Sequence, residues 1–147
     1  MPKAHFNVLQ GHSREQIKRL IRETSDAMLR VLQAPKDRHE IWVTEIDPEL
    51  WGIEGETAAD VLRTRPLAEI EMPFVEMALM EGRPKEQHHA IIAEVSEITA
   101  RTLGCTKDRI RVHIVNANPD NWGIGGIPAS VRRADELLAR AKSSQVA

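Results

Sequence analysis

The sequence predicts an α/β (α+β) fold in which two tandem β-α-β units form one four-stranded mixed sheet with two helices on one face. Two observations predict it. The chain of 147 residues repeats itself at an offset of 71 positions, and each copy reads as strand, helix, strand and a short segment that closes on glycine. A β-α-β unit pairs its strands in parallel through a right-handed crossover, so each unit supplies two strands and one helix.

Short identical motifs carry the repeat. When residues 2–56 are aligned with residues 73–127 without a gap, 17 of the 55 positions are identical, against roughly three expected for unrelated segments. The shared motifs are Pro2/Pro73, Gly11/Gly82, Glu15-Gln16/Glu86-Gln87, Lys36-Asp37-Arg38/Lys107-Asp108-Arg109 and Trp51-Gly52-Ile53/Trp122-Gly123-Ile124. We therefore divide a single domain, 1–147, into repeat one at 2–56, a linker at 57–72, repeat two at 73–127 and a C-terminal helix at 128–142.

Local patterns predict each element in turn. Residues 3–9 and 74–80 predict the first strands, and residues 40–46 and 110–116, rich in β-branched side chains, predict the second strands. Ser13 and Gln16 predict a capping box at the start of the first helix, and Pro84 suits the first turn of the second. Each helix carries one apolar face: Ile17, Leu20, Ile21, Thr24, Met28, Val31 and Leu32 in repeat one, and Ile91, Val95, Ile98 and Leu103 in repeat two.

Two further segments are less regular. The Trp-Gly-Ile segment that ends each repeat predicts a short hairpin, and residues 57–62 suit a helical turn in the linker. With both helices on one face, the other face of the sheet is predicted to be apolar and to need a partner, which indicates an oligomer.

Composition excludes several classes of function. A formal charge of −2 and a pI near 6.3 argue against a general nucleic-acid binder, which is normally basic. The single cysteine, Cys105, excludes an internal disulfide and a cysteine-based metal cluster, and the six histidines form no metal-binding motif. Glycine-rich nucleotide motifs and the GxSxG motif are absent from the sequence, so no cofactor is expected. Because no segment resembles a signal peptide or a membrane span, a cytoplasmic location without membrane contact is expected.

Pro2 is the first candidate for chemistry. A proline behind the initiator methionine normally becomes the N-terminal residue, and it is then a secondary amine. A free α-amino group titrates near about 8, so modest desolvation or nearby positive charge makes it a neutral base around pH 7. Pro73 lacks this chemistry because its nitrogen lies in a peptide bond. The alternative is a proline that merely begins a strand.

The two copies differ where a ligand would be held. After the first strand, repeat one has His12 where repeat two has Arg83, and at the second strand it has Glu40 where repeat two has Arg111. An arginine can grip a carboxylate through two parallel hydrogen bonds. The pattern therefore predicts a divided site, with the amine in repeat one and the arginines in repeat two. The alternative is that Arg83 and Arg111 are ordinary surface charges.

These residues resemble the tautomerase superfamily, and 4-oxalocrotonate tautomerase in particular. The similarity is strongest along Pro73–Arg132 and looser along 2–56, so the chain resembles a fused member with the tautomerase (macrophage migration inhibitory factor-like) fold. The landmarks are Glu81-Gly82-Arg83, Glu86-Gln87, Glu94-Val95-Ser96, Arg109-Ile110-Arg111-Val112 and Trp122-Gly123-Ile124-Gly125-Gly126.

The resemblance implies a cofactor-independent keto–enol tautomerase acting on a small carboxylate, either a 2-hydroxydienoate or an arylenolpyruvate. It implies that Pro2 is the general base, that Arg83 and Arg111 bind the carboxylate and withdraw electrons, and that Trp122 walls the pocket. It also implies a homotrimer that imitates a hexamer of short subunits. His12 and Glu40 depart from the family pattern, so a second pocket, beside Pro73 and Trp51, is expected to be inactive.

Alternatives remain within and beyond that chemistry. Haloacrylate dehalogenases of the superfamily need an acidic residue where this chain has Ile124 and an arginine where it has Met80, which argues against that activity. Malonate semialdehyde decarboxylases use an Asp-Arg segment that Asp37-Arg38 matches, although repeat two has the same pair. A non-catalytic binding or signalling protein on this scaffold is another alternative. If Met1 stays on Pro2, the chain is a pseudoenzyme.

Overall fold

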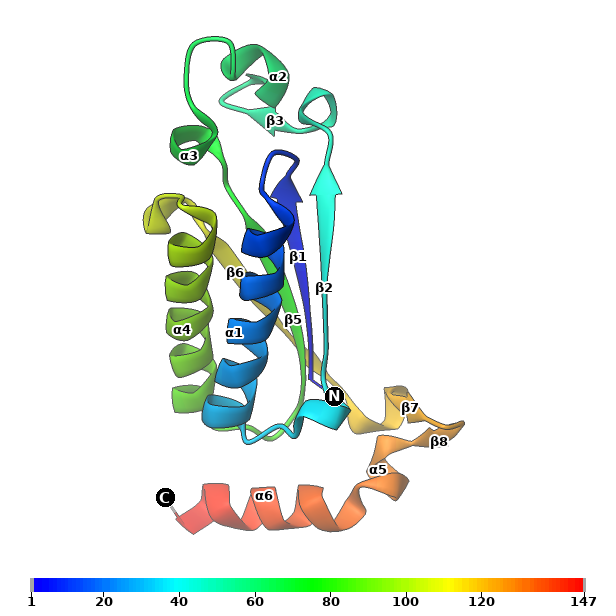
Figure 1. The fold of residues 1–147 in the computed structure, drawn as a ribbon. Helices are drawn as coiled ribbons and strands as arrows, with labels where there is room; N and C mark the ends of the chain where they lie inside the picture. Colours follow the sequence, from blue (N-terminus) through cyan, green and yellow to red (C-terminus); the bar gives the residue numbers. More distant parts are fainter. Residues whose placement is uncertain (1, 147) are drawn as a thin grey trace.

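The structure, a computed structural model that describes residues 2–146, is a four-stranded sheet with two long helices packed on one face (Figure 1). The strands are β1 (Lys3–Leu9), β2 (Glu40–Ile46), β5 (Phe74–Met80) and β6 (Arg111–Ala117), and the long helices are α1 (Arg14–Leu32) and α4 (Lys85–Leu103). The order across the sheet is β2-β1-β5-β6. The predicted fold is therefore confirmed, although β6 begins one residue later than expected.

The sheet is parallel within each repeat and antiparallel between the repeats. Lys3 pairs with Glu40 in the parallel β1–β2 ladder, and Phe74 pairs with Arg111 in the parallel β5–β6 ladder. At the centre, β1 and β5 run in opposite directions, so Lys3 pairs with Ala78. The first strand of each repeat therefore begins near the place where the first strand of the other repeat finishes.

The core fills the space between the helices and the sheet. Ser13 caps α1 with the expected capping box, because its hydroxyl accepts from the Gln16 backbone N–H while the Gln16 side chain accepts from the Ser13 backbone N–H. The apolar faces predicted for both helices point inward. The largest fully buried side chains of this core come from both repeats: Phe6, Val8, Leu20, Met28, Leu32, Met77, Leu79 and Ile91.

The face of the sheet opposite the helices is more polar than expected. Its side chains alternate with the buried ones along each strand. The His5 ring stacks on Trp42 with 4.9 Å between ring centroids, and His5 Nε2 lies 2.7 Å from the Thr44 hydroxyl. Lys3 Nζ lies 5.3 Å from the centre of the Trp42 ring. The face is therefore mixed rather than apolar, because polar side chains lie there beside the exposed Trp42 and Val115.

Small elements cover the two ends of the sheet (Figure 1). At one end lie the hairpin β3 (Gly52–Ile53) with β4 (Glu56–Thr57) and the linker helices α2 (Ala58–Val61) and α3 (Leu67–Ile70). At the other end lie the hairpin β7 (Gly123–Ile124) with β8 (Ile127–Pro128) and the C-terminal helices α5 (Ala129–Arg132) and α6 (Ala134–Val146). Four short 3-10 helices complete the chain: η1 (Lys36–Arg38), η2 (Pro48–Leu50), η3 (Lys107–Arg109) and η4 (Pro119–Asn121).

Within residues 2–146, no helix has the length and apolarity that crossing a membrane requires. In the same part of the chain, His, Cys, Asp and Glu side chains do not gather in threes in a way that could hold a metal ion.

Candidate active site

Three of the four candidate site residues lie at one end of the sheet, which we call the proline end. Because β1 and β5 are antiparallel, the start of β1 at Pro2 lies beside the finish of β5. The turn that follows β5 carries Arg83, and the segment that follows β6 carries Trp122. Pro2 is buried, and its carbonyl accepts a hydrogen bond of 3.2 Å from the backbone N–H of Glu40. This bond holds Pro2 against the start of β2.

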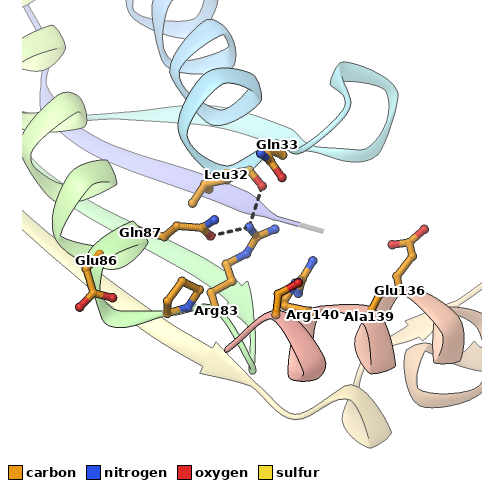
Figure 2. A pocket seen from close by; sticks show the side chains of 10 residues that line it. Leu32, Gln33, Arg83, Glu86, Gln87, Glu136, Ala139 and Arg140 are labelled. Atoms are coloured by element: carbon orange, nitrogen blue, oxygen red, sulfur yellow. Dashed lines mark hydrogen bonds between the residues drawn. The ribbon is translucent and has the colours of Figure 1, made fainter. Parts of the chain in front are cut away.

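Two adjoining cavities open at this end. One, of about 370 Å³, lies between the 33–40 loop, Trp122 and the C-terminal helices, and we call it the proline-end cavity. The second, of about 650 Å³, lies between the ends of α1 and α4 and the helix α6, and we call it the interhelical cavity (Figure 2). Arg83, Glu136 and Arg140 line both cavities. Pro2 lines neither; its hydrogen-bond partner Glu40 lines the proline-end cavity.

The Arg83 guanidinium is hydrogen-bonded through Nη1 but not through Nε. Its Nη1 donates to the Leu32 carbonyl at 2.7 Å and to Gln87 Oε1 at 3.1 Å, which fixes the guanidinium between the two long helices (Figure 2). Its Nε is buried and has no hydrogen-bond partner in the described part of the chain. A buried donor without a partner indicates a place for a ligand acceptor. Burial, together with the positive charge of Arg140, lowers the pKa of Arg83 to about 10, so the group stays charged at neutral pH.

Trp122 forms one wall of the proline-end cavity. It follows the 3-10 helix η4, and its carbonyl accepts from the Ala129 backbone N–H at 2.7 Å. That bond ties the segment after β6 to α5, so the half-buried indole lies in a supported position. Trp122 thus lines the proline-end cavity, and its predicted role as a pocket wall for a substrate stays a prediction.

Arg111 lies at the opposite end of the sheet. Continuing the β1–β5 register by one residue places Pro2 opposite Leu79, which pairs with Asn116. Arg111 is five residues away from Asn116, which is about 17 Å along the strand. The Arg111 side chain is exposed, and its Nη1 donates to the Asp108 carbonyl at 2.7 Å. One chain therefore does not bring Pro2 and Arg111 together.

At the Pro73 end of the sheet, the carboxylate of Glu71 lies beside His12, in the position that a ligand's carboxylate would take beside Arg83 at the proline end. His12, the counterpart of Arg83, has its Nε2 2.7 Å from Glu71 Oε1, and Glu71 Oε2 accepts from the Leu9 backbone N–H at 2.7 Å. The His12 and Glu71 side chains are 3% and 0% exposed, so this is an interior pair. Leu9 and Ile53 of repeat one form a small apolar cluster with Ala58 and Ile70 of the linker.

Sequence reasoning missed Glu71 because it lies in the linker and has no counterpart in the repeat. The available signal was a charged residue between Ile70 and Met72, immediately before a buried strand. A carboxylate in such a position must find hydrogen-bond donors inside the protein. We therefore find that the place beside Pro73 is filled by the protein itself, whereas the place beside Arg83 adjoins two cavities.

The Asp37-Arg38 pair lies at the proline end and has its own partner. Both residues line the proline-end cavity. Arg38 Nη1 lies 2.7 Å from Glu136 Oε1, so this ion pair joins η1 to α6 across the cavity. The Arg38 guanidinium lowers the pKa of Glu136, and the charges of Arg133 and Arg140 add to the effect.

Comparison with known proteins gives one family. The family model described as "Tautomerase enzyme" matches residues 2–60 and again residues 73–132. The chain is 42% identical to the 2-hydroxymuconate tautomerase of Pseudomonas putida over 59 residues, which are 40% of this chain and 94% of that protein. It is 43% identical to the 2-hydroxymuconate tautomerase of Pseudomonas sp. (strain CF600) over 63 residues, which are 42% of this chain and the whole of that protein.

Solved structures match the whole arrangement of two repeats. The crystal structure of a native fused 4-OT is 28% identical, with a TM-score of 0.78 over 88% of this chain and 97% of that chain. A fused 4-OT described as a wild-type asymmetric trimer is 27% identical, with a TM-score of 0.77 over 88% of this chain and 98% of that chain. The macrophage migration inhibitory factor of Toxoplasma gondii shares the fold, with 19% identity and a TM-score of 0.67 over 86% and 98%.

Proposed function

Because the chain belongs to the tautomerase family, we propose that Pro2, freed by removal of Met1, is the general base of a cofactor-independent keto–enol tautomerisation. The substrate is a small carboxylate, either a 2-hydroxydienoate or an arylenolpyruvate. The observation that carries the proposal is that Pro2, Arg83 and Trp122 lie at one end of the sheet, where Arg83 and Trp122 line the proline-end cavity. At the other end, Glu71 already binds His12, the counterpart of Arg83.

Keto–enol tautomerisation requires a neutral amine positioned to accept and return one proton. The secondary amine of Pro2 accepts the proton of the substrate hydroxyl, and the same proton is delivered to a carbon of the conjugated chain. The substrate changes from enol to ketone with no gain or loss of atoms or electrons. Burial at the start of β1 favours the neutral amine, and so supports a base that works near pH 7.

In this proposal, Arg83 and Trp122 of the same chain as Pro2 bind the substrate and shield it from water. The unpartnered Arg83 Nε supports a role in binding a carboxylate, since a guanidinium binds that group through two parallel hydrogen bonds. Trp122 shields the reacting end of the substrate from water, which strengthens the electrostatic interaction with Arg83.

A second subunit supplies Arg111 in this proposal. Arg111 lies about 17 Å along the strand from the level of Pro2, so it can join the site only from another copy. The fused 4-OT at 27% identity is described as a trimer, and we propose a homotrimer, a pseudo-hexamer of repeats, for this chain. In it, the exposed Arg111 of one subunit reaches the proline end of the next.

The activity test uses protein whose intact mass shows that Met1 has been removed. We expect it to accelerate loss of enol absorbance from 2-hydroxymuconate or phenylenolpyruvate well above the rate in buffer. A correctly processed, folded and oligomeric protein that accelerates neither would contradict the proposal.

Mixed oligomers test the shared site. Pro2→Ala and Arg111→Ala subunits should each form nearly inactive oligomers, with Arg111→Ala about a hundredfold slower because the developing negative charge loses its donor. Oligomers reassembled from an equal mixture should regain about a quarter of wild-type activity, since a quarter of random pairings join two intact contributors. Mixed oligomers, verified by mass, that stay as inactive as their parents would contradict a site shared between subunits.

A further inference from the structure

We propose that Gln87 is a positioning residue that fixes the Arg83 guanidinium in the orientation that binds the substrate carboxylate. This inference rests on the proposed function and deepens it, because it names the residue through which Arg83 is oriented. Gln87 lies in the first turn of α4, four residues after Arg83, and the two side chains line the interhelical cavity together (Figure 2). Gln87 therefore acts through Arg83 and does not have to touch the substrate.

The N–H groups of Arg83 Nη1 meet two acceptors. One is the Leu32 carbonyl at 2.7 Å, and the other is Gln87 Oε1 at 3.1 Å (Figure 2). The Leu32 carbonyl is at the end of α1, where carbonyls have no partner within their own helix and attract a positive charge. Because both N–H groups of Nη1 are used, the edge formed by Nε and Nη2 is left for a ligand. A carboxylate binds such an edge through two parallel hydrogen bonds.

The amide oxygen of Gln87 is available to Arg83 because Pro84 has no backbone N–H. In repeat one, the same place in the helix is a capping box, in which Gln16 Oε1 accepts from the Ser13 backbone N–H at 2.9 Å. Pro84 is the counterpart of Ser13, and Gln87 is the counterpart of Gln16. Since α4 has no side-chain cap, the glutamine oxygen is directed to the guanidinium instead.

The equivalent glutamine makes a different hydrogen bond at the Pro73 end. There, Gln16 Nε2 donates directly to the Thr102 carbonyl in the last turn of α4, at 3.2 Å. At the proline end, Arg83 makes the corresponding bond to the last turn of α1, and Gln87 accepts from Arg83. The glutamine thus supports an arginine only at the end that carries Pro2. This difference favours a role in binding over a role in folding alone.

Loss of the Gln87 oxygen should allow the Arg83 guanidinium to rotate. Nη1 would keep only its bond to the Leu32 carbonyl, and a single bond does not fix the plane of the group. A misaligned guanidinium cannot present Nε and Nη2 together to a carboxylate, so positioning and binding are both weakened. The amine of Pro2 stays unchanged, and we therefore expect the loss to affect KM more than kcat.

The kinetic test compares Gln87→Met with Gln16→Met, the same replacement at the equivalent position of repeat one. Methionine keeps the length of the side chain and removes the acceptor. For 2-hydroxymuconate, Gln87→Met should lower kcat/KM about five- to tenfold, mostly through KM. Gln16→Met loses the capping box and should lower Tm, but it should leave kcat/KM within about twofold well below Tm. An unchanged kcat/KM in Gln87→Met, or an equal loss in both variants, would overturn the proposal.

A double-mutant cycle shows whether Gln87 acts through Arg83. In an Arg83→Ala background the guanidinium is absent, so adding Gln87→Met should lower kcat/KM by less than about a further twofold. If the double variant shows the full additional loss, Gln87 acts on the substrate or on the fold, and it is not a positioning residue for Arg83.

NMR spectroscopy separates this proposal from the proposed function. The Nε–H signal of Arg83, assigned by its absence from Arg83→Lys, should be visible in wild type near neutral pH because the atom is buried. In Gln87→Met, the signal should broaden through faster exchange with water, whereas Gln16→Met should leave it unchanged. This result supports the positioning role even in a protein that turns over no enol. If Gln87→Met leaves the signal unchanged, the inference fails even in an active tautomerase.

Discussion

Inserting one alanine between Met1 and Pro2 is expected to abolish tautomerase activity, and Pro2→Ala to lower kcat/KM about a hundredfold or more. The insertion keeps the proline ring and every other side chain, but it converts the proline nitrogen from an amine into an amide. An amide nitrogen does not accept a proton near pH 7, so the general base is lost, and general-base catalysis contributes about 10²- to 10⁴-fold. Initial rates of enol loss, measured on protein of verified mass, give the result.

Pro73→Ala is the matched control. Pro73 holds the equivalent position at the start of β5 and is buried as Pro2 is, but its nitrogen already lies within the chain. We expect its replacement to leave kcat/KM within about twofold, because the position takes no part in proton transfer. If the Pro2 and Pro73 variants lose the same activity while remaining folded, the amine of Pro2 is not the base.

Glu71→Ala is expected to be the most destabilising single substitution proposed for this chain. It leaves the Leu9 backbone N–H and the His12 ring buried without their acceptor. Leaving a buried hydrogen-bonding group unsatisfied costs about 1–3 kcal/mol, so the two groups together cost about 2–6 kcal/mol. For a chain of this length, such a loss lowers Tm by roughly 10 °C. Glu71→Gln keeps the shape and one acceptor oxygen, so we expect a smaller fall.

The control for Glu71 lies two residues away. Glu69 is exposed in α3, which ends just before Glu71, and Glu69→Ala should change Tm by only about 1–2 °C. Calorimetric Tm values that fall equally for the Glu69 and Glu71 variants would contradict a structural role for the buried pair. Activity at 20 °C should survive in Glu71→Ala, since Glu71 lies at the opposite end of the sheet from Pro2.

Cys105 gives a second way to measure the effect of replacing Glu71. Burial, together with the negative charge of Glu71, raises the pKa of its thiol to about 11. At pH 8 the thiol is therefore neutral, and its alkylation by iodoacetamide should be slow in the native protein. In Glu71→Gln the pKa should fall toward its ordinary value, and the alkylation rate at pH 8 should rise.

Much of the fold could be predicted because both repeats carry the same strand–helix–strand pattern. The capping box at Ser13, the apolar faces of α1 and α4 and three of the four strand boundaries follow from local patterns that packing does not override. The C-terminal segment is a finer case. The predicted single helix is two helices, α5 and α6, separated by Arg133 at φ −121 and ψ 24. No proline or glycine at this position indicates the break in the sequence.

The candidate site depended on how the two repeats pair, which local patterns do not encode. The sequence predicted that His12 and Arg83 mark different ends of the molecule; in the structure His12 pairs with Glu71, whereas Arg83 lines the proline-end cavity. The antiparallel pairing of β1 with β5 then decided that Arg83 joins Pro2 and that Arg111 does not. Arg140 and Glu71 escaped notice because they lie outside both repeats, where the sequence offers no internal comparison.

The linker between the repeats also determines how the molecule responds to dilution. Joining the two β-α-β units converts their meeting along β1 and β5 from an encounter of separate chains into a step within one chain. A tether of this kind sets an effective concentration in the millimolar range, whatever the concentration of the protein. Dilution of the proposed trimer can therefore separate its subunits, but it leaves the two repeats of each chain paired. The fusion thus keeps the start of β1, with Pro2, beside the finish of β5, which leads to Arg83, at any protein concentration.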